Sequence, residues 1–252
     1  MDLGLKGKRA IVTGGSRGIG KAIADTLAGE GVDIAICARG QEGVDAQVDA
    51  LKGKGVNAYG EAVDVTSEAY EAFINNAANA LGGLDIFVSN VSAMGGRQDV
   101  DGWRANFETD VLSTVRGAQT AIPHMEASGG GSIVIIATTA ALETFGGPQA
   151  YNSMKAAIIN YSSNLAQDLA PKKIRVNAVS PGAIYFKGGA WEFIENNMPD
   201  MYNGVLGQIP AGRFGDPQDI ANAVTFLSSP AADYATATNL VVDGGLTKRV
   251  QY

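Results

Sequence analysis

The sequence of 252 residues contains one cysteine, Cys37, and one histidine, His124. A lone cysteine excludes a disulfide within the chain, and a lone histidine excludes zinc sites built from two or three imidazoles. The chain has no run of about 18 apolar residues that could span a membrane, and its amino end lacks the hydrophobic block of a signal peptide. We therefore expect no bound metal, no membrane partner and a cytoplasmic location.

Positive charge is also scarce. The 19 Lys and Arg residues are outnumbered by 26 Asp and Glu residues, which gives a formal net charge of -7. A protein that grips the nucleic-acid backbone needs clustered cations, so this balance argues against a nucleic-acid partner. Hydrophobic residues make up 46% of the chain and charged residues 18%, a composition typical of a globular protein. No linker or repeat divides the chain, and residues 1–252 are predicted to form a single domain.

Short apolar runs alternate with longer amphipathic stretches, which is typical of βαβ units and a mostly parallel sheet. The predicted strands are Arg9–Thr13, Asp33–Cys37, Ala58–Val63, Asp85–Ser89, Ser132–Ala137, Arg175–Val179 and Asn239–Val242. The predicted helices are Ile19–Gly29, Val44–Lys52, Glu68–Leu81, Trp103–Ala127, Ala150–Leu169 and Pro217–Leu227. Residues 183–212 mix glycines with aromatic residues and methionines, so they are predicted to form a long insertion rather than a core element.

A glycine-rich turn, Thr13–Gly20, follows the first predicted strand. Glycines at a strand-to-helix turn let the backbone approach a pyrophosphate, which the free N–H groups of the helix start attract. The same residues also fit the G-x-S-x-G nucleophile elbow of α/β-hydrolases, with Ser16 as nucleophile. That alternative needs a histidine on a late loop, whereas His124 lies near the end of a predicted helix. A tight turn without a ligand is the remaining interpretation.

The end of the second predicted strand indicates which nicotinamide cofactor is used. An NAD-binding unit usually carries an acid there for the adenosine ribose, and a 2′-phosphate needs a cation instead. Here Ala38 takes the place of the acid, Arg39 follows, and Arg17 stands in the glycine-rich turn. This pattern favours NADP(H) over NAD(H), unless both arginines are ordinary solvated side chains. Asp64 follows the third strand and could bind the adenine amino group or cap the next helix.

Tyr151 and Lys155 lie at positions i and i+4 of a predicted helix, hence on one face. A nearby cation favours the phenolate and lowers the pKa of a tyrosine toward the working pH, where it can exchange a proton. Taken alone, this spacing is frequent by chance on helices. Tyr151 is therefore a candidate acid or base whose weight depends on the other motifs.

Taken together, the motifs resemble those of the short-chain dehydrogenase/reductase family, in the single-domain branch that includes 3-oxoacyl-acyl-carrier-protein reductases. The matching segments are TGGSRGIG at 13–20, VDV at 63–65, YNSMK at 151–155, NAVSPG at 177–182, RFGDPQDIANAVTFL at 213–227 and VVDGG at 241–245. Their order and spacing cover nearly the whole chain. Together with these other motifs, the spacing of Tyr151 and Lys155 is not expected to arise by chance.

The resemblance implies a doubly wound, Rossmann-type α/β fold with a seven-stranded parallel sheet and a substrate loop at about 183–212. It implies that Tyr151 protonates the carbonyl oxygen and that Lys155 holds the nicotinamide ribose. It also implies a homotetramer built through the long helices. The cofactor-binding residues that it implies are Gly14, Ser16, Arg17, Gly18, Ile19, Gly20, Arg39, Asp64, Val65, Asn90, Tyr151, Lys155, Pro181, Gly182 and Ile184.

The chain departs from the family pattern at four places. Thr138 stands where the family has the serine that binds the substrate oxygen, and Asp110 replaces an asparagine that supports a water-linked proton path. Ser89–Ser92 lacks a family glycine, and Phe186 replaces a threonine that often contacts the carboxamide. If the Asp110 carboxylate lies near Lys155, it would partly neutralise the cation. Otherwise it points away and caps or bridges neighbouring helices.

The function expected from these residues is an NADP(H)-dependent oxidoreductase that interconverts a ketone or aldehyde and an alcohol, with Tyr151, Lys155, Thr138 and Asp110 as catalytic residues. Aromatic residues and methionines at 183–212 favour a partly apolar carbonyl substrate. The alternatives are a dinucleotide-binding protein that has lost turnover and, more remotely, the α/β-hydrolase that uses Ser16.

Overall fold

The computed structural model describes residues 2–94 and 98–250. Seven parallel strands form one sheet in the order β3-β2-β1-β4-β5-β6-β7. The strands are β1 (Arg9–Thr13), β2 (Asp33–Ala38), β3 (Ala58–Ala62), β4 (Ile86–Ser89), β5 (Gly131–Ile136), β6 (Ile174–Pro181) and β7 (Asn239–Val242). The α-helices are α1 (Gly18–Gly29), α2 (Gln41–Lys52), α3 (Ala69–Leu81), α4 (Val100–Asn106), α5 (Ser113–Ala127), α6 (Ala150–Leu169), α7 (Ala190–Asn197), α8 (Pro199–Leu206) and α9 (Pro217–Ser228). The doubly wound, seven-stranded fold expected from the sequence is confirmed.

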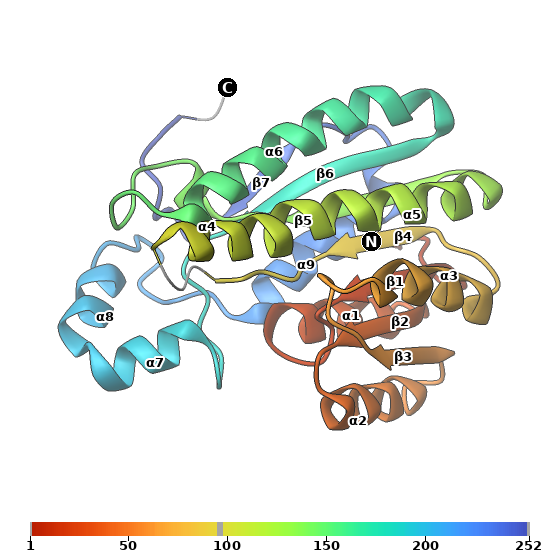
Figure 1. Ribbon diagram of the computed structural model, residues 1–252, viewed down its shortest axis with the longest axis horizontal. Coiled ribbons are helices and arrows are strands. Elements are labelled where there is room, and N and C mark those ends of the chain that lie inside the picture. Colours follow the sequence, from red (N-terminus) through yellow and green to blue (C-terminus); the bar gives the residue numbers. More distant parts are fainter. Residues whose placement is uncertain (1, 95–97, 251–252) are drawn as a thin grey trace.

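The sheet is covered by helices on both faces, because successive side chains of a strand point to opposite sides. In β2, Ile34 and Ile36 belong to the apolar layer that contains α1, α2 and α9. Ala35 and Cys37 belong to the other layer, which contains α3, α5 and α6. Figure 1 shows α5 and α6 running side by side along the sheet. Strands buried on both faces explain why the sequence showed continuous apolar runs rather than alternation.

The strand order changes direction between β1 and β4. The chain winds outward from β1 through β2 to β3, then returns to the other side of β1 and continues from β4 to β7. The loops that leave β1 and β4 therefore diverge at the carboxyl edge of the sheet. Such a switch point is where open α/β sheets bind their ligands, and the glycine-rich turn lies there.

The fourth predicted helix is interrupted in register. It was predicted over Trp103–Ala127, and the structure has α4, a π-helical segment at Phe107–Leu112, and α5 in direct succession. A π-helical segment holds one extra residue per turn and occurs often at functional sites. Asp110 falls inside this segment and is fully buried.

The predicted insertion at 183–212 contains two short helices, α7 and α8, which lie together at one end of the molecule (Figure 1). It has a small apolar cluster of its own, built on Ala183, Val205, Ile209 and Phe214. The expectation of a segment outside the sheet is met, but its two helices and separate cluster were not predicted. In the described parts of the chain, no helix combines the length and the apolar character that crossing a membrane requires.

Candidate active site

The glycine-rich turn brings the backbone of β1 close to the start of α1. Gly14 and Gly18 have φ angles of 66° and 55°, which favour glycine. A Cβ atom on Gly20 would lie 2.3 Å from the carbonyl oxygen of Gly14 and 2.5 Å from Nδ2 of Asn90. The first turn of α1 has no side-chain cap and no acidic residue. Its backbone N–H groups are thus able to bind an anion such as pyrophosphate.

Asn90 fixes the two strand ends that flank the switch point. Its backbone N–H donates to Oγ1 of Thr13 at 2.9 Å, and its side-chain amide donates to the carbonyl oxygen of Thr13 at 2.9 Å. The predicted site residue Asn90 is therefore held against the glycine-rich turn. Thr13 was not predicted as a site residue, and its hydroxyl is the group that completes this contact.

The residues predicted to select the cofactor lie at the carboxyl ends of β1 and β2. Arg17 and Arg39 are both exposed, and the strands that they follow are neighbours in the sheet. Ser16 lies close to Gly43 in the first turn of α2, whose start has no side-chain cap. The hydroxyl, the two guanidinium groups and the start of α2 form a region able to receive a phosphate.

Asp64 closes a tight turn after β3 and does not cap the next helix. Its carboxylate accepts hydrogen bonds from the backbone N–H and the hydroxyl of Thr66, at 2.9 and 2.8 Å. The N–H bond from Thr66 is the main cause that lowers the pKa of Asp64, and the charge of Arg39 lowers it further. The capping alternative was wrong, because α3 begins at Ala69 and the carboxylate closes a turn instead. Its neighbour Val65 is buried in the core.

Tyr151 stands in the first turn of α6 and is half-buried. Burial raises the pKa of its hydroxyl to about 12, and the hydrogen bond with Thr138 opposes this rise while the charge of Asp110 adds to it. The structure thus brings two of the predicted site residues, Thr138 and Tyr151, together. The expected lowering of the tyrosine pKa is not found, since burial outweighs the hydrogen bond and the nearby carboxylate acts in the same direction as burial.

Lys155 lies one turn further along α6 and is turned inward. Its Nζ donates to the carbonyl oxygen of Ile136 at 2.9 Å and lies 3.1 Å from Oδ1 of Asp110. The second carboxylate oxygen of Asp110 accepts the backbone N–H of Ala93 at 3.2 Å. Asp110 therefore faces the lysine rather than pointing away from it. The carbonyl of Ile136 was missed, because a backbone acceptor leaves no signal in the sequence.

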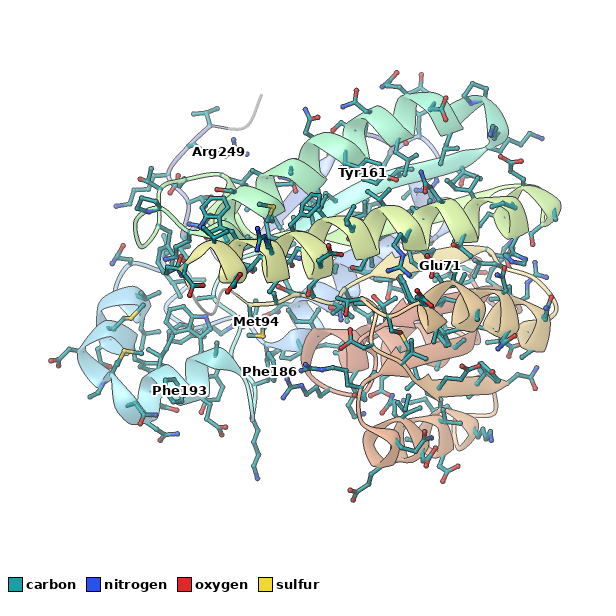
Figure 2. All side chains as sticks on the ribbon, viewed as in Figure 1. Glu71, Met94, Tyr161, Phe186, Phe193 and Arg249 are labelled. Carbon is teal, nitrogen blue, oxygen red and sulfur yellow. The ribbon has the colours of Figure 1, made fainter. Side chains whose placement is uncertain are left out.

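The end of β6 carries the chain from the sheet into the insertion. Gly182, which follows Pro181, donates its N–H to the carbonyl oxygen of Val242 at 2.9 Å. Ile184 is buried and forms an isolated parallel bridge with Gly215. A Cβ atom on Gly18 would lie 2.7 Å from the ring of Phe186, so this ring packs directly on the glycine-rich turn. Figure 2 shows Phe186 at the base of the segment that leads into α7.

The groups required by the α/β-hydrolase alternative are not brought together. Nε2 of His124 lies 2.7 Å from Oδ1 of Asn75, on α3, so the single imidazole pairs with an amide rather than with Ser16. Across residues 2–94 and 98–250, no group of three or more His, Cys, Asp or Glu side chains is arranged to hold a metal ion.

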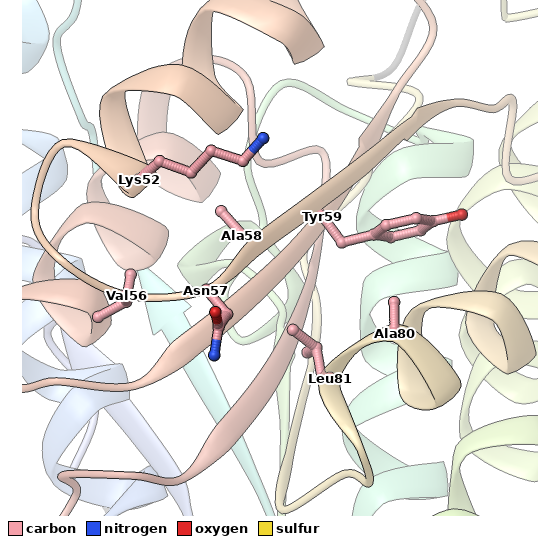
Figure 3. A pocket seen from close by; sticks show the side chains of 7 residues that line it. All are labelled: Lys52, Val56, Asn57, Ala58, Tyr59, Ala80 and Leu81. Atoms are coloured by element: carbon pink, nitrogen blue, oxygen red, sulfur yellow. The ribbon is translucent and has the colours of Figure 1, made fainter.

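Two surface hollows lie away from these residues. One of about 340 Å³ is lined by the ends of α2 and α3 and the start of β3, from Lys52 to Leu81 (Figure 3). Another of about 500 Å³ lies at the amino ends of β4, β5 and β6. Neither contains a predicted site residue, and both lie at the wrong ends of the strands for a ligand of this fold.

Comparisons with known proteins agree with the geometry. The family described as Enoyl-(Acyl carrier protein) reductase matches residues 14–247. Dehydrogenase/reductase SDR family member 4 of Oryctolagus cuniculus is 36% identical over 254 residues, which cover 98% of this chain and 96% of the relative.

Two solved structures have the same fold. A 7α-hydroxysteroid dehydrogenase complexed with NADH and 7-oxo glycochenodeoxycholic acid is 36% identical, with a TM-score of 0.90 over 97% of this chain and 96% of that one. The L-sorbose reductase of Gluconobacter frateurii complexed with NADPH and L-sorbose is 33% identical, with a TM-score of 0.90 over 99% of this chain and all of that one. A full-length match in sequence and fold, joined to the glycine-rich turn and the tyrosine–lysine helix, shows that the chain belongs to the short-chain dehydrogenase/reductase family.

Proposed function

We propose that this oxidoreductase uses NADP(H) to interconvert a ketone or aldehyde and the corresponding alcohol. The observation that carries the proposal is the hydrogen bond between Thr138 and Tyr151, with Lys155 one turn along the same helix and buried against Ile136 and Asp110. A hydroxyl pair and a cation next to a dinucleotide site suit carbonyl chemistry, in which one oxygen exchanges a proton. A protein that only bound the nucleotide would have no use for the tyrosine.

The residues present fit a dinucleotide. A Cβ atom on Gly14, Gly18 or Gly20 would crowd neighbouring protein atoms, so only glycines permit this tight turn, which directs the backbone N–H groups at the start of α1 toward a phosphate. The free N–H groups of α1 would hold the pyrophosphate, and Asp64 and Asn90 would bind on the adenosine side and the nicotinamide side. When bound, the cofactor would supply or accept a hydride.

The choice of NADP(H) is supported by the charges at the ends of β1 and β2. Arg17 and Arg39 are both exposed. Position 38, where an NAD-binding unit usually carries an acid, is occupied by Ala38. Two guanidinium groups can bind a 2′-phosphate through charge-assisted hydrogen bonds. The two solved structures described above do not decide the question, because one is complexed with NADH and the other with NADPH.

Three side chains divide the work on the substrate. Tyr151 Oη donates a proton to the carbonyl oxygen during reduction and receives it back during alcohol oxidation. The hydroxyl of Thr138 holds the same oxygen, and its hydrogen bond with Tyr151 orients the phenol. Nζ of Lys155 donates to the carbonyl oxygen of Ile136 and pairs electrostatically with Asp110, and it keeps N–H donors for a ribose hydroxyl.

A partly apolar substrate is supported by the side chains on the insertion. Phe193, Met198 and Met201 on or between α7 and α8 are exposed, as is Met94 after β4. Figure 2 shows Met94, Phe186 and Phe193 on the same side of the molecule. Such side chains adapt to apolar ligands of varied shape.

We further propose a homotetramer built through α5 and α6, which sedimentation equilibrium would test.

The experiment that tests the function is a panel of ketones and alcohols incubated with NADPH or NADH and followed at the nicotinamide absorbance. We expect turnover with NADPH on apolar ketones. Tight NADPH binding without turnover on any compound would instead favour the alternative of a nucleotide-binding protein.

A further inference from the structure

The ion pair between Asp110 and Lys155 is closed off from solvent. Nζ of Lys155 lies 3.1 Å from Oδ1 of Asp110, and the two side chains are 2% and 0% exposed. Among the residues that the structure describes, Oδ1 has no hydrogen-bond partner, so the contact with Lys155 is an electrostatic pairing. Water and salt screen such a pair poorly, and the carboxylate therefore acts strongly on the ammonium and on the groups beside it.

The fold holds this carboxylate in place. Asp110 lies in the π-helical segment between α4 and α5, and its second oxygen accepts the N–H of Ala93 at 3.2 Å. Its backbone carbonyl accepts the hydroxyl of Thr114 at 2.9 Å. The other partner of Lys155 is the carbonyl oxygen of Ile136, at 2.9 Å. Both members of the pair are thus fixed from two sides and have little freedom to separate.

The groups that act on the Tyr151 hydroxyl are Thr138, which lies after β5, and Asp110, which lies on the π-helical segment. Lys155 lies one turn along α6 from Tyr151 and pairs with Asp110. Among the described residues, burial, the Thr138 hydrogen bond and the Asp110 charge are what shift the pKa of Tyr151, and the net direction is upward, to about 12. A neutral side chain at position 110 would leave the lysine cation uncompensated and would remove one of the two causes of the rise.

On the basis of the function proposed above, we propose that Asp110 is a positioning residue that neutralises the Lys155 cation and so shifts alcohol oxidation to more alkaline solution. In that direction the alcohol carbon gives its hydride to NADP+ and the alcohol hydroxyl gives its proton to Oη of Tyr151. The products are the ketone, NADPH and neutral Tyr151, which then releases the proton to solvent. The step begins from the phenolate, which the lysine cation stabilises and the Asp110 charge destabilises.

The first test is the pH dependence of kcat for alcohol oxidation in the Asp110→Asn variant. The amide keeps the size of the side chain and removes its charge. We expect the kinetic pKa to fall by about one unit, so that the rate on the acidic limb rises about tenfold. The control is Asp168→Asn, which removes an exposed carboxylate on α6, the helix that carries Tyr151 and Lys155. This variant should leave the profile unchanged. An unchanged profile in a folded Asp110→Asn variant would overturn the proposal.

The second test does not need turnover. Tyrosinate absorbance is titrated in the unmodified protein and in Tyr151→Phe, and the difference gives the ionisation of Tyr151; the same pair is then measured in the Asp110→Asn background. We expect Tyr151 to ionise at or above its ordinary pKa of about 10 in the unmodified protein and at lower pH in the Asp110→Asn protein. Equal ionisation in the two backgrounds would overturn the inference, because burial alone would then account for the raised pKa. Failure of the substrate panel would reject the proposed function, whereas this titration judges Asp110 separately.

Discussion

Tyr151 and Lys155 lie one turn apart on α6, yet their surroundings differ. The tyrosine is half-buried and shares a hydrogen bond with Thr138, while the lysine is enclosed by Ile136 and Asp110. The phenol is thus the group that a substrate can reach, and the ammonium acts through its charge and its remaining N–H. This difference predicts different consequences for the removal of each side chain.

Replacement of Tyr151 by phenylalanine should abolish turnover and leave the Kd of NADPH nearly unchanged, because the lost hydroxyl acts on the substrate. General acid catalysis contributes about 100-fold to 10,000-fold, and kcat should fall by at least that much. Calorimetric titration with NADPH measures binding, and Tyr161→Phe on the same helix is the matched control. A Tyr151→Phe variant that kept most of its rate would contradict the assignment.

The preference for NADPH should depend on Arg39. We expect the unmodified protein to bind NADPH more tightly than NADH, and Arg39→Asp to narrow or reverse this difference because an acid repels the 2′-phosphate. Loss of a charge-assisted hydrogen bond costs about 1.5–3 kcal/mol. The Kd values of both cofactors are compared for each variant, with Lys172→Ala as a control at the far end of α6. Equal affinities in the unmodified protein would refute the assignment.

At the scale of elements, the aromatic ring of Phe186 packs between the glycine-rich turn and the start of the insertion. Phe186 packs on Gly18 at the start of α1 and also lies against Gly189, so that a Cβ atom on either glycine would be 3.0 Å or less from the ring. The chain then continues from Gly189 into α7. The segment that precedes the helices α7 and α8 is therefore anchored to the glycine-rich turn.

The contact predicts a coupling between two substitutions. Gly18→Ala should destabilise the fold by about 1–2 kcal/mol for its positive φ and by a further 1–3 kcal/mol for the clash with Phe186. In a Phe186→Ala background only the first cost should remain. Urea unfolding of the four proteins measures the coupling, and additive free energies of unfolding would show that the ring does not crowd Gly18.

The elements themselves followed well from the sequence. All seven predicted strands are found, with ends shifted by at most two residues, because continuous apolar runs bounded by glycine and aspartate are a strong signal. The π-helical segment at Phe107–Leu112 was not predictable. Its residues fit an ordinary amphipathic helix, and nothing in their order marks the extra residue per turn.

The candidate site was predicted in part, for similar reasons. Motif spacing predicted that Tyr151 and Lys155 lie one turn apart on a helix and that the glycines lie between β1 and α1, since these positions depend on local geometry along one element. The direction of the Asp110 side chain stayed open, because it depends on the register set by the π-helical segment. The turn closed by Asp64 and the packing of Phe186 on Gly18 involve neighbours that the sequence order does not reveal.

At the scale of the whole molecule, the sheet separates two apolar layers, and the strands supply side chains to both. Cys37 belongs to the layer covered by α3, α5 and α6 and is fully buried. Burial is the main cause that raises the pKa of its thiol to about 12. The thiolate, which is the reactive form, is therefore both rare and enclosed in the native protein.

Because Cys37 is the single cysteine of the chain, its rate of alkylation reports how often the sheet opens. Thiol labelling at pH 8 should be slower than in urea-unfolded protein by a factor that tracks the unfolding equilibrium. Saturating NADPH should slow it further, by about 100-fold when the nucleotide is at 100 times its Kd. Labelling of native protein as fast as of unfolded protein would show that β2 opens locally. Each variant described above can be ranked for stability by this one reaction, without a denaturant series.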